Sequence, residues 1–241
     1  EANVIDGLTE GVVTASIKPT ERVTDLARLT GTTNAYSIEI SSEDAAVTAW
    51  YLNTINFRTT VAVDLTNVTS ITSSSLTDLE TLSTAIGNNE FTNDEGLTAI
   101  AVSDTTIDAT TLASTISKYD VINGSGTTSM TLASGATINI DAGEITQILA
   151  NETASRLSII DQNIVVTGSV SREVQDLLSA TTTGTVTAVD NTSSVTFRRT
   201  SVETTLSSES VYQPLSDVEA LNYLASHDDL IEFFDSDNGY L

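Results

Sequence analysis

The chain has 241 residues, of which 39% are hydrophobic and 5% aromatic, so its core must be built mainly from small branched side chains. With 33 acidic against 9 basic residues, a net charge of −24 and no basic cluster larger than Arg198-Arg199, it lacks the footprint that binds nucleic acid or anionic lipid. The absence of Cys excludes disulfide scaffolds, thiol catalysis and Cys-based metal sites, and no apolar run reaches the roughly 20 residues that membrane insertion needs.

A repeated unit organises residues 1–190. Each copy has a β-branched strand, a polar segment of the residue types that begin helices, a short helix with apolar residues three or four apart, and a Gly, Asn or Thr exit. Strands are predicted at 12–17, 36–40, 61–63 with 68–71, 98–102, 136–140 and 163–166. The helices that follow are predicted to turn these equivalent residues toward the core: Leu26, Leu52, Leu79, Leu112, Ile145 and Leu177.

The spacing of those helix residues decides the predicted architecture. By subtraction of residue numbers it is 26, 27, 33, 33 and 32 residues. One helix with one or two strands cannot bury its apolar face alone, so neighbouring units must stack, and a right-handed crossover is usual between parallel strands. We therefore predict an α/β repeat fold, a right-handed β-solenoid-like stack of strand-plus-short-helix repeats. The alternative is tandem β-sandwich domains, which the helical period of segments such as 25–29 (DLARL) disfavours.

The pattern changes after residue 190. Residues 191–214 are predicted to hold a closing β element and a linker that contains Pro214, and residues 215–241 a small helical module. Within the module, the stretch 217–234 (DVEALNYLASHDDLIEFF) resembles a helical unit, ALxYIASYxDLIxAF, of large extracellular proteins of aquatic bacteria. It departs from that unit at His227, where an aromatic residue is usual, and at Phe234-Asp235, where Phe-Gly is usual.

The Thr/Ser-rich repeats before the module are similar to repeats of the same bacterial proteins and of some phage fibres. The resemblance is to haemolysin-type secreted, surface-layer and adhesin-like proteins of aquatic bacteria and their phages. It implies an extracellular or cell-surface location, or a place in a virion, and an association with calcium. Since no signal peptide precedes Glu1, we expect a processed or excerpted chain.

No catalytic constellation is expected, and we predict that the chain is not an enzyme. His227 is the only histidine and stands at a predicted helix start, where capping is the common role. The carboxylate pairs Glu43-Asp44, Asp94-Glu95 and Asp228-Asp229 also stand at predicted helix starts, where acidic groups complement the helix dipole.

One segment is a candidate metal site. The run 235–239 (DSDNG) is similar to the opening of a calcium loop, because alternate acidic and amide side chains supply the oxygen ligands that calcium prefers. Asp235, Asp237 and Asn238 are the candidate calcium ligands, and no other cofactor is expected.

Three functions remain open from the sequence. The leading one is a structural subunit or repeat region of an extracellular surface assembly, a surface layer, filament or adhesin, that works through contacts with copies of itself or with other surface or virion proteins. The second is a fibre or decoration protein of a phage virion. The third is a carbohydrate-binding solenoid, with Trp50, Tyr51, Phe57 and Arg58 as its nearest aromatic cluster, although Trp50 and Tyr51 are expected to pack on the row of helices.

Overall fold

The structure is a computed structural model that describes residues 1–122, 128–189 and 194–197. The chain divides into two compact units, Glu1–Arg199 and Thr200–Leu241, and every described residue belongs to the first. The predicted helical module 215–241 and most of the segment 191–214 therefore lie outside the described residues. None of the described helices is both long enough and apolar enough to cross a bilayer.

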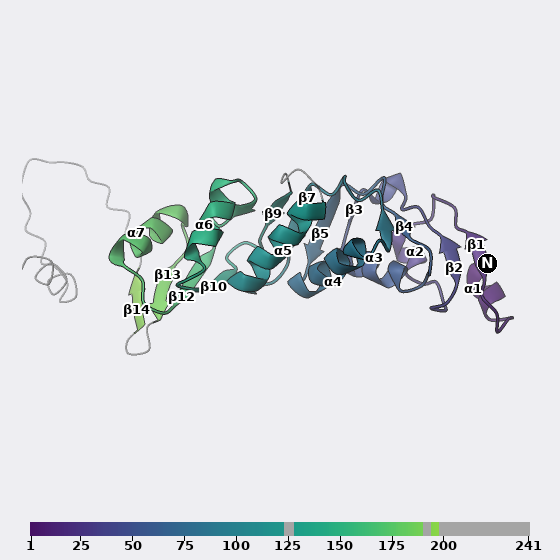
Figure 1. Cartoon of the computed structure of the whole chain (residues 1–241), viewed down its shortest axis with the longest axis horizontal. Helices are drawn as coiled ribbons and strands as arrows, with labels where there is room; N and C mark the ends of the chain where they lie inside the picture. Colours follow the sequence, from purple (N-terminus) through teal and green to yellow (C-terminus); the bar gives the residue numbers. More distant parts are fainter. Residues whose placement is uncertain (123–127, 190–193, 198–241) are drawn as a thin grey trace, which may run out of the picture. The chain divides into compact units, whose positions relative to one another are not determined.

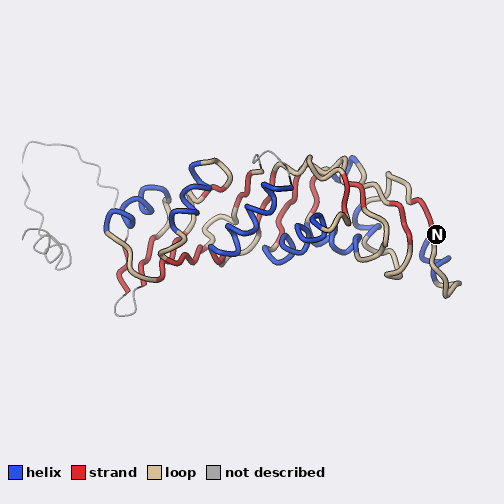
Figure 2. The backbone as a smooth tube through the Cα atoms, viewed as in Figure 1, coloured by secondary structure: helices blue, strands red, loops and turns tan. Residues whose placement is uncertain are grey.

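The first unit has the mixed α/β character that the sequence predicts, with helices and short strands alternating along the chain (Figures 1 and 2). The described helices are α1 (Ala2–Asp6), α2 (Val23–Leu26), α3 (Ala49–Asn56), α4 (Leu76–Gly87), α5 (Ala109–Ile122), α6 (Ile145–Thr153) and α7 (Arg172–Thr181), with the 3₁₀-helix η1 (Ser42–Asp44). The strands are β1 (Thr14–Ser16), β2 (Ala35–Ser37), β3 (Ala46–Val47), β4 (Val63–Asp64), β5 (Ser70–Ser74), β6 (Phe91–Thr92), β7 (Ala99–Val102), β8 (Thr106–Asp108), β9 (Ser129–Thr131), β10 (Thr137–Asp141), β11 (Leu157–Ser158), β12 (Asn163–Thr167), β13 (Val186–Val189) and β14 (Ser194–Phe197).

The strands form parallel sheets in which neighbours come from successive repeats. Two sheets have five strands each, in the orders β11-β9-β7-β5-β3 and β14-β13-β12-β10-β8, and the pairs β1-β2 and β4-β6 form two smaller sheets. Every described strand pair is parallel except β13-β14. Because β-sandwiches are built from antiparallel sheets, the alternative of tandem sandwich domains does not describe this unit.

Apolar side chains stack on one another from strand to strand and fix the register of the sheets. In the first large sheet the paired residues form a buried ladder: Val47, Ile71, Ile100, Met130 and Leu157. In the second sheet an equivalent buried ladder is formed by Ile107, Ile138, Ile164 and Val186. Since a slip of one residue turns every side chain of a strand to the opposite face, these ladders make any other register unfavourable.

Each helix from α2 to α5 contacts the helix that follows it in the chain. In Figure 1 the helices from α3 to α7 line one side of the strands. The fourth residue of each helix from α2 to α6 has a buried aliphatic side chain: Leu26, Leu52, Leu79, Leu112 and Ile148. Four of the six predicted equivalent positions are thus confirmed at the same place in their helices.

The last two predicted equivalent positions differ in the structure. Ile145 is buried, but it is the first residue of α6, and Ile148 occupies the equivalent position. In α7 the prediction is wrong, because Leu177 is 52% exposed whereas Leu178 is completely buried. Consecutive residues of a helix point about 100° apart, so a pair of leucines gives the sequence pattern two possible inward faces, and packing against β13 selects Leu178.

Threonine hydroxyls connect each repeat to the one before it, which explains the abundance of this residue. The hydroxyl of Thr69 donates to the carbonyl of Ala45 at 3.2 Å, and that of Thr183 donates to the carbonyl of Ile160 at 2.9 Å. Similar bonds are donated by Thr60, Thr98, Thr131 and Thr167. A β-branched side chain with a hydroxyl suits a strand and also supplies a polar bond between strands.

Side chains of one repeat also cap the helix of the repeat before it. The first N–H group of α2 donates to Asp44 Oδ2 at 2.9 Å, that of α3 to Ser74 Oγ at 2.8 Å, and that of α4 to Asp104 Oδ2 at 2.7 Å. The first N–H groups of a helix have no partner within it, so each cap satisfies a donor that is otherwise unpaired. The starts of these three helices therefore depend on the presence of the next repeat.

Candidate functional site

The predicted calcium ligands Asp235, Asp237 and Asn238 lie outside the described residues, and so does His227. Residues 1–122, 128–189 and 194–197 hold no group of three or more His, Asp or Glu side chains placed to bind a metal ion. The candidate binding sites among the described residues are therefore surface features, a groove and a strand edge.

The carboxylate pair Glu43-Asp44 has a structural role at one of its two positions. Asp44 is buried, caps α2 and forms an ion pair with Arg22, with Nη2 and Oδ1 3.0 Å apart. Glu43 is exposed and contacts the same guanidinium group at 2.7 Å. This pair stands at the start of the 3₁₀-helix η1, as the prediction of a helix start requires.

The pair Asp94-Glu95 was expected at a helix start, and this expectation is wrong. Both residues lie in the turn between β6 and β7. Burial and the neighbouring charge of Glu95 raise the pKa of Asp94 above its ordinary value of 3.8. A tight turn at Asn93, whose φ is +56°, places them there, because Asn tolerates the left-handed conformation well.

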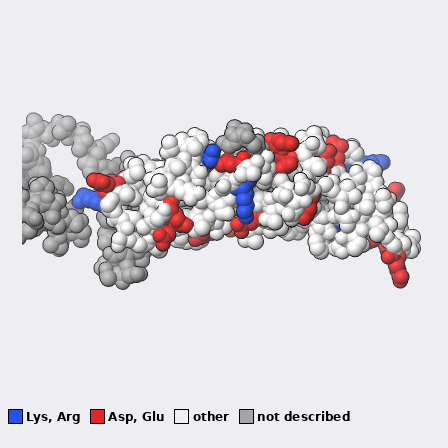
Figure 3. Space-filling view, viewed as in Figure 1, with Lys and Arg blue, Asp and Glu red and all other residues white. Residues whose placement is uncertain are grey.

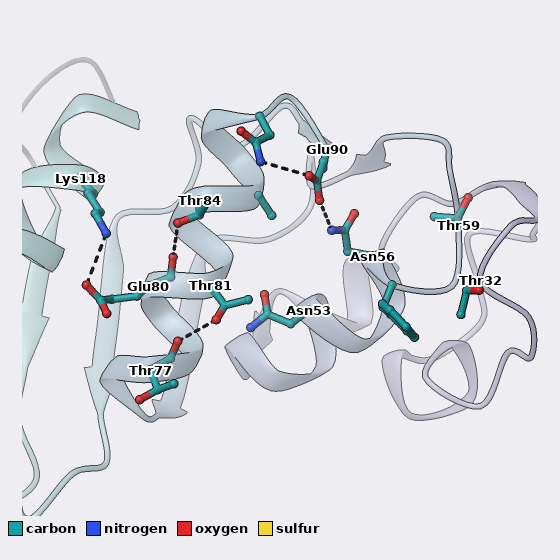
Figure 4. A pocket seen from close by; sticks show the side chains of 13 residues that line it. Thr32, Asn53, Asn56, Thr59, Thr77, Glu80, Thr81, Thr84, Glu90 and Lys118 are labelled. Atoms are coloured by element: carbon teal, nitrogen blue, oxygen red, sulfur yellow. Dashed lines mark hydrogen bonds and ion pairs between the residues drawn. The ribbon is translucent and has the colours of Figure 1, made fainter.

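One hollow of the described surface is an open groove on the helix row, with a volume of about 710 Å³ (Figure 4). Residues of α3, α4 and α5 line it together with residues of the connecting loops. Its lining consists of Thr32, Asn53, Asn56, Phe57, Thr59, Thr77, Glu80, Thr81, Thr84, Ala85, Asn88, Glu90 and Lys118. The groove is therefore lined by hydroxyl, amide and carboxylate groups, with one aromatic ring.

Hydrogen bonds and one ion pair hold the polar groups of the groove in place (Figure 4). Asn56 Nδ2 donates to Glu90 Oε2 at 2.5 Å, and Asn88 Nδ2 donates to Glu90 Oε1 at 3.3 Å. Lys118 Nζ lies 3.4 Å from Glu80 Oε1. One carboxylate is thus held by two amides and the other by an ammonium group.

Two aromatic side chains of this region are largely exposed. Trp50 is 53% exposed and Phe57 is 64% exposed, whereas Tyr51 is partly buried against the core. The rings of Trp50 and Tyr51 meet edge to face, with their centroids 5.0 Å apart, and the Arg58 guanidinium lies 5.6 Å from the centre of the Phe57 ring. The expectation that both Trp50 and Tyr51 pack on the helix row holds for Tyr51 alone.

A second surface lies at β1, an edge strand among the described residues. The carbonyl of Val13 and the amide of Ile17 bond to the β2 segment. Because the backbone groups of alternate residues in a strand point to opposite edges, the N–H and C=O groups of Thr14 and Ser16 point to the open edge. An open edge of this kind is a template for a further strand.

Exposed apolar side chains precede and flank this edge strand. They are Val4, Ile5, Leu8 and Val12. The helix α1 that carries the first two is attached to the second repeat through Asp6, which accepts hydrogen bonds from Asn34 Nδ2 at 2.8 Å and Thr30 Oγ1 at 2.7 Å. These two bonds lower the pKa of Asp6 below its ordinary value of 3.8. We call the residues 4–16 the N-terminal edge.

The groove residues Asn56, Glu80, Asn88, Glu90 and Lys118 were not identified from the sequence. They come from three helices and a loop, and only the stacking of the repeats brings them together.

Fold and surfaces together define a mixed α/β protein of stacked parallel strands with an open edge and a polar groove. No protein-family model, no curated protein and no solved structure matches the chain.

Proposed function

We propose that this chain is a structural subunit of an extracellular surface assembly, such as a surface layer, a filament, an adhesin or a virion fibre, and that it binds copies of itself. The architecture that we propose for it is a right-handed, β-solenoid-like stack in which each repeat adds one coil. The parallel pairing of strands one repeat apart and the caps shared between repeats support this architecture.

The N-terminal edge is the observation that carries the proposal. Its outward-pointing backbone groups at Thr14 and Ser16 need partners, and its exposed Val4, Leu8 and Val12 need apolar cover. A second copy supplies both, because a strand added to an open edge gains backbone hydrogen bonds while its flanking side chains bury apolar surface. Assembly then uses the same interactions that join the repeats within one chain.

Charge sets the conditions under which copies associate. At a net charge of −24, two copies repel each other at low ionic strength. Asp and Glu lie in separate groups along the face shown in Figure 3, and Lys and Arg are few on it. Salt screens such charges and calcium binds them, so both are expected to strengthen the association.

The test is sedimentation velocity of the full chain over a range of protein concentration, with and without added salt and calcium. We expect reversible oligomers that become more abundant with either addition. The double variant Leu8→Ser/Val12→Ser and the single variant Thr14→Pro, which removes an outward-pointing N–H and fixes φ at residue 14, are expected to sediment as monomers. The matched control Ile160→Ser/Leu177→Ser removes exposed apolar side chains elsewhere and is expected to associate like the parent.

Circular dichroism of each variant checks that the fold is retained. A parent chain that stays monomeric under every condition would refute the proposal. Oligomers that persist in both N-terminal variants would show that self-association does not use the N-terminal edge.

A further inference from the structure

The groove of about 710 Å³ on the helix row has the size of a ligand site but not the lining of one for apolar molecules. Phe57 and Ala85 are its only apolar lining residues, and the other lining residues carry hydroxyl, amide, carboxylate or ammonium groups. A ligand that fits this lining must offer many hydrogen-bond donors and acceptors. The groove is open to solvent and not enclosed, so a ligand longer than the groove can extend beyond it.

The charges of the groove exclude anions. Its carboxylates are Glu80 and Glu90, and its only cation is Lys118, which is paired with Glu80. The lining itself therefore keeps one negative charge, with the Arg58 guanidinium outside it, 5.6 Å from the centre of the Phe57 ring, and the molecule as a whole is strongly acidic. Phosphate, nucleic acid and sulfated or carboxylated polymers are repelled from such a surface.

The polar groups around Glu90 are held in positions where they can hydrogen-bond to the hydroxyl groups of a ligand. Asn56 and Asn88 hold its two oxygens from different segments, so the carboxylate is oriented before a ligand arrives. Each amide nitrogen carries two hydrogens and donates one of them to Glu90, which leaves the second for a ligand oxygen. Adjacent hydroxyls of a sugar ring both donate and accept, as this arrangement requires.

Phe57 supplies the aromatic part of the groove lining. It directly follows α3 as its C-cap residue, and the exposed Trp50, which is not a lining residue, stands seven residues before it on α3. A pyranose ring has C–H groups on its faces and hydroxyls on its edge, and therefore packs on an aromatic ring while its edge meets polar groups.

We propose that this groove binds a neutral oligosaccharide, with Glu90, Asn56 and Asn88 bonding to hydroxyls and with Phe57 packing against a sugar ring. The inference stands on the groove alone and is independent of the self-association proposed above. Such a site would let the protein hold a glycan surface while its N-terminal edge contacts another copy.

Trp50 is the only tryptophan of the chain and stands on α3 beside the lining residue Asn53, so its fluorescence reports on the surroundings of the groove. The full chain is titrated with maltotetraose, cellotetraose and triacetylchitotriose, and with a heparin tetrasaccharide as the anionic comparison. We expect a saturable change in Trp50 emission with at least one neutral sugar and none with the heparin fragment. Calorimetry with the same sugars gives the affinity without reliance on the fluorophore.

Variants separate specific binding from adventitious binding. Glu90→Gln and Phe57→Ala change exposed side chains and are each expected to weaken binding about five- to tenfold, the effect of one lost hydrogen bond or aromatic contact. The control Leu177→Ala removes an exposed side chain from α7 and is expected to bind like the parent. The Trp50→Phe variant should lose the optical signal but retain heat of binding.

Three results would overturn the inference. They are the absence of a saturable response to every neutral sugar at millimolar concentration, binding that is unchanged in both Glu90→Gln and Phe57→Ala, and binding of the anionic fragment alone. The N-terminal variants that abolish self-association should leave sugar binding intact, so failure of one proposal is distinguishable from failure of the other.

Discussion

Leu177 and Leu178 provide a matched pair for testing which face of α7 is packed. Leu178 is completely buried, and Leu177 is 52% exposed. The substitutions Leu178→Ala and Leu177→Ala remove the same atoms from neighbouring positions of the same helix. Differences in helix propensity and in the unfolded chain therefore cancel when the two variants are compared.

The expected magnitudes follow from the burial of each side chain. Truncation of a buried leucine to alanine loses about 0.8 kcal/mol for each apolar group removed, and the cavity left behind adds to this, for a total of about 3 kcal/mol. Truncation at Leu177 is expected to change stability by less than about 1 kcal/mol, because much of that side chain contacts water in the folded state.

Hydrogen exchange measured by mass spectrometry locates the effect. In a stack of repeats each layer contacts only its neighbours, so the loss should appear mainly in α7 and β13, which contact each other, and not in α4. A loss of 3 kcal/mol corresponds to exchange about a hundredfold faster in Leu178→Ala. Equal effects of the two variants, or a larger effect of Leu177→Ala, would mean that α7 is rotated by about 100° from the orientation described.

Two further predictions concern charged groups. Asp44→Ala is expected to destabilise the chain by about 1–3 kcal/mol, since it leaves the first amide of α2 and the Arg22 guanidinium without their buried partner, whereas Glu43→Ala should change stability by less than about 0.5 kcal/mol. Thermal melts that rank these two variants in the opposite order would contradict the capping role. Because the pKa of Asp6 is lowered in the folded state, its stabilising effect is complete above pH 3.8 and is lost as the pH falls through the folded value. The protection of the α1 amides, measured relative to their intrinsic exchange rate at each pH, should therefore decrease below pH 3.8 in the parent and show no such step in Asp6→Asn; the same step in both would exclude Asp6 as its cause.

The helices α2 to α7 were predictable because their signals are local, whereas α1 was not predicted. A polar capping residue followed by apolar residues three or four apart marks each start, and Ser75 and Ser171 indeed accept hydrogen bonds from the first turns of α4 and α7. The longer strands were predictable for the same reason, as in β10 and β12, where buried and partly exposed residues alternate.

The shorter strands and the groove carry no such local signal. Strands of two or three residues, such as β3, β6, β8, β9 and β11, are defined by the neighbours they pair with and not by a period of their own. The groove depends on Asn56, Glu90 and Lys118, which are ordinary polar residues of a helix or loop in the sequence. Only the packing of three successive helices makes them a common lining.

The edge of the second large sheet at β14 differs from the edge of the separate two-stranded sheet at β1. Along the second large sheet, parallel pairing stops at β13, whose next neighbour, β14, is antiparallel to it. At β1 the parallel order is not interrupted by an antiparallel strand, and the open edge offers the same alternation of N–H and C=O groups through which β1 binds β2. A strand from another copy can therefore pair with β1 in the parallel arrangement that already joins β1 to β2. For this reason self-association is expected at the N-terminal edge.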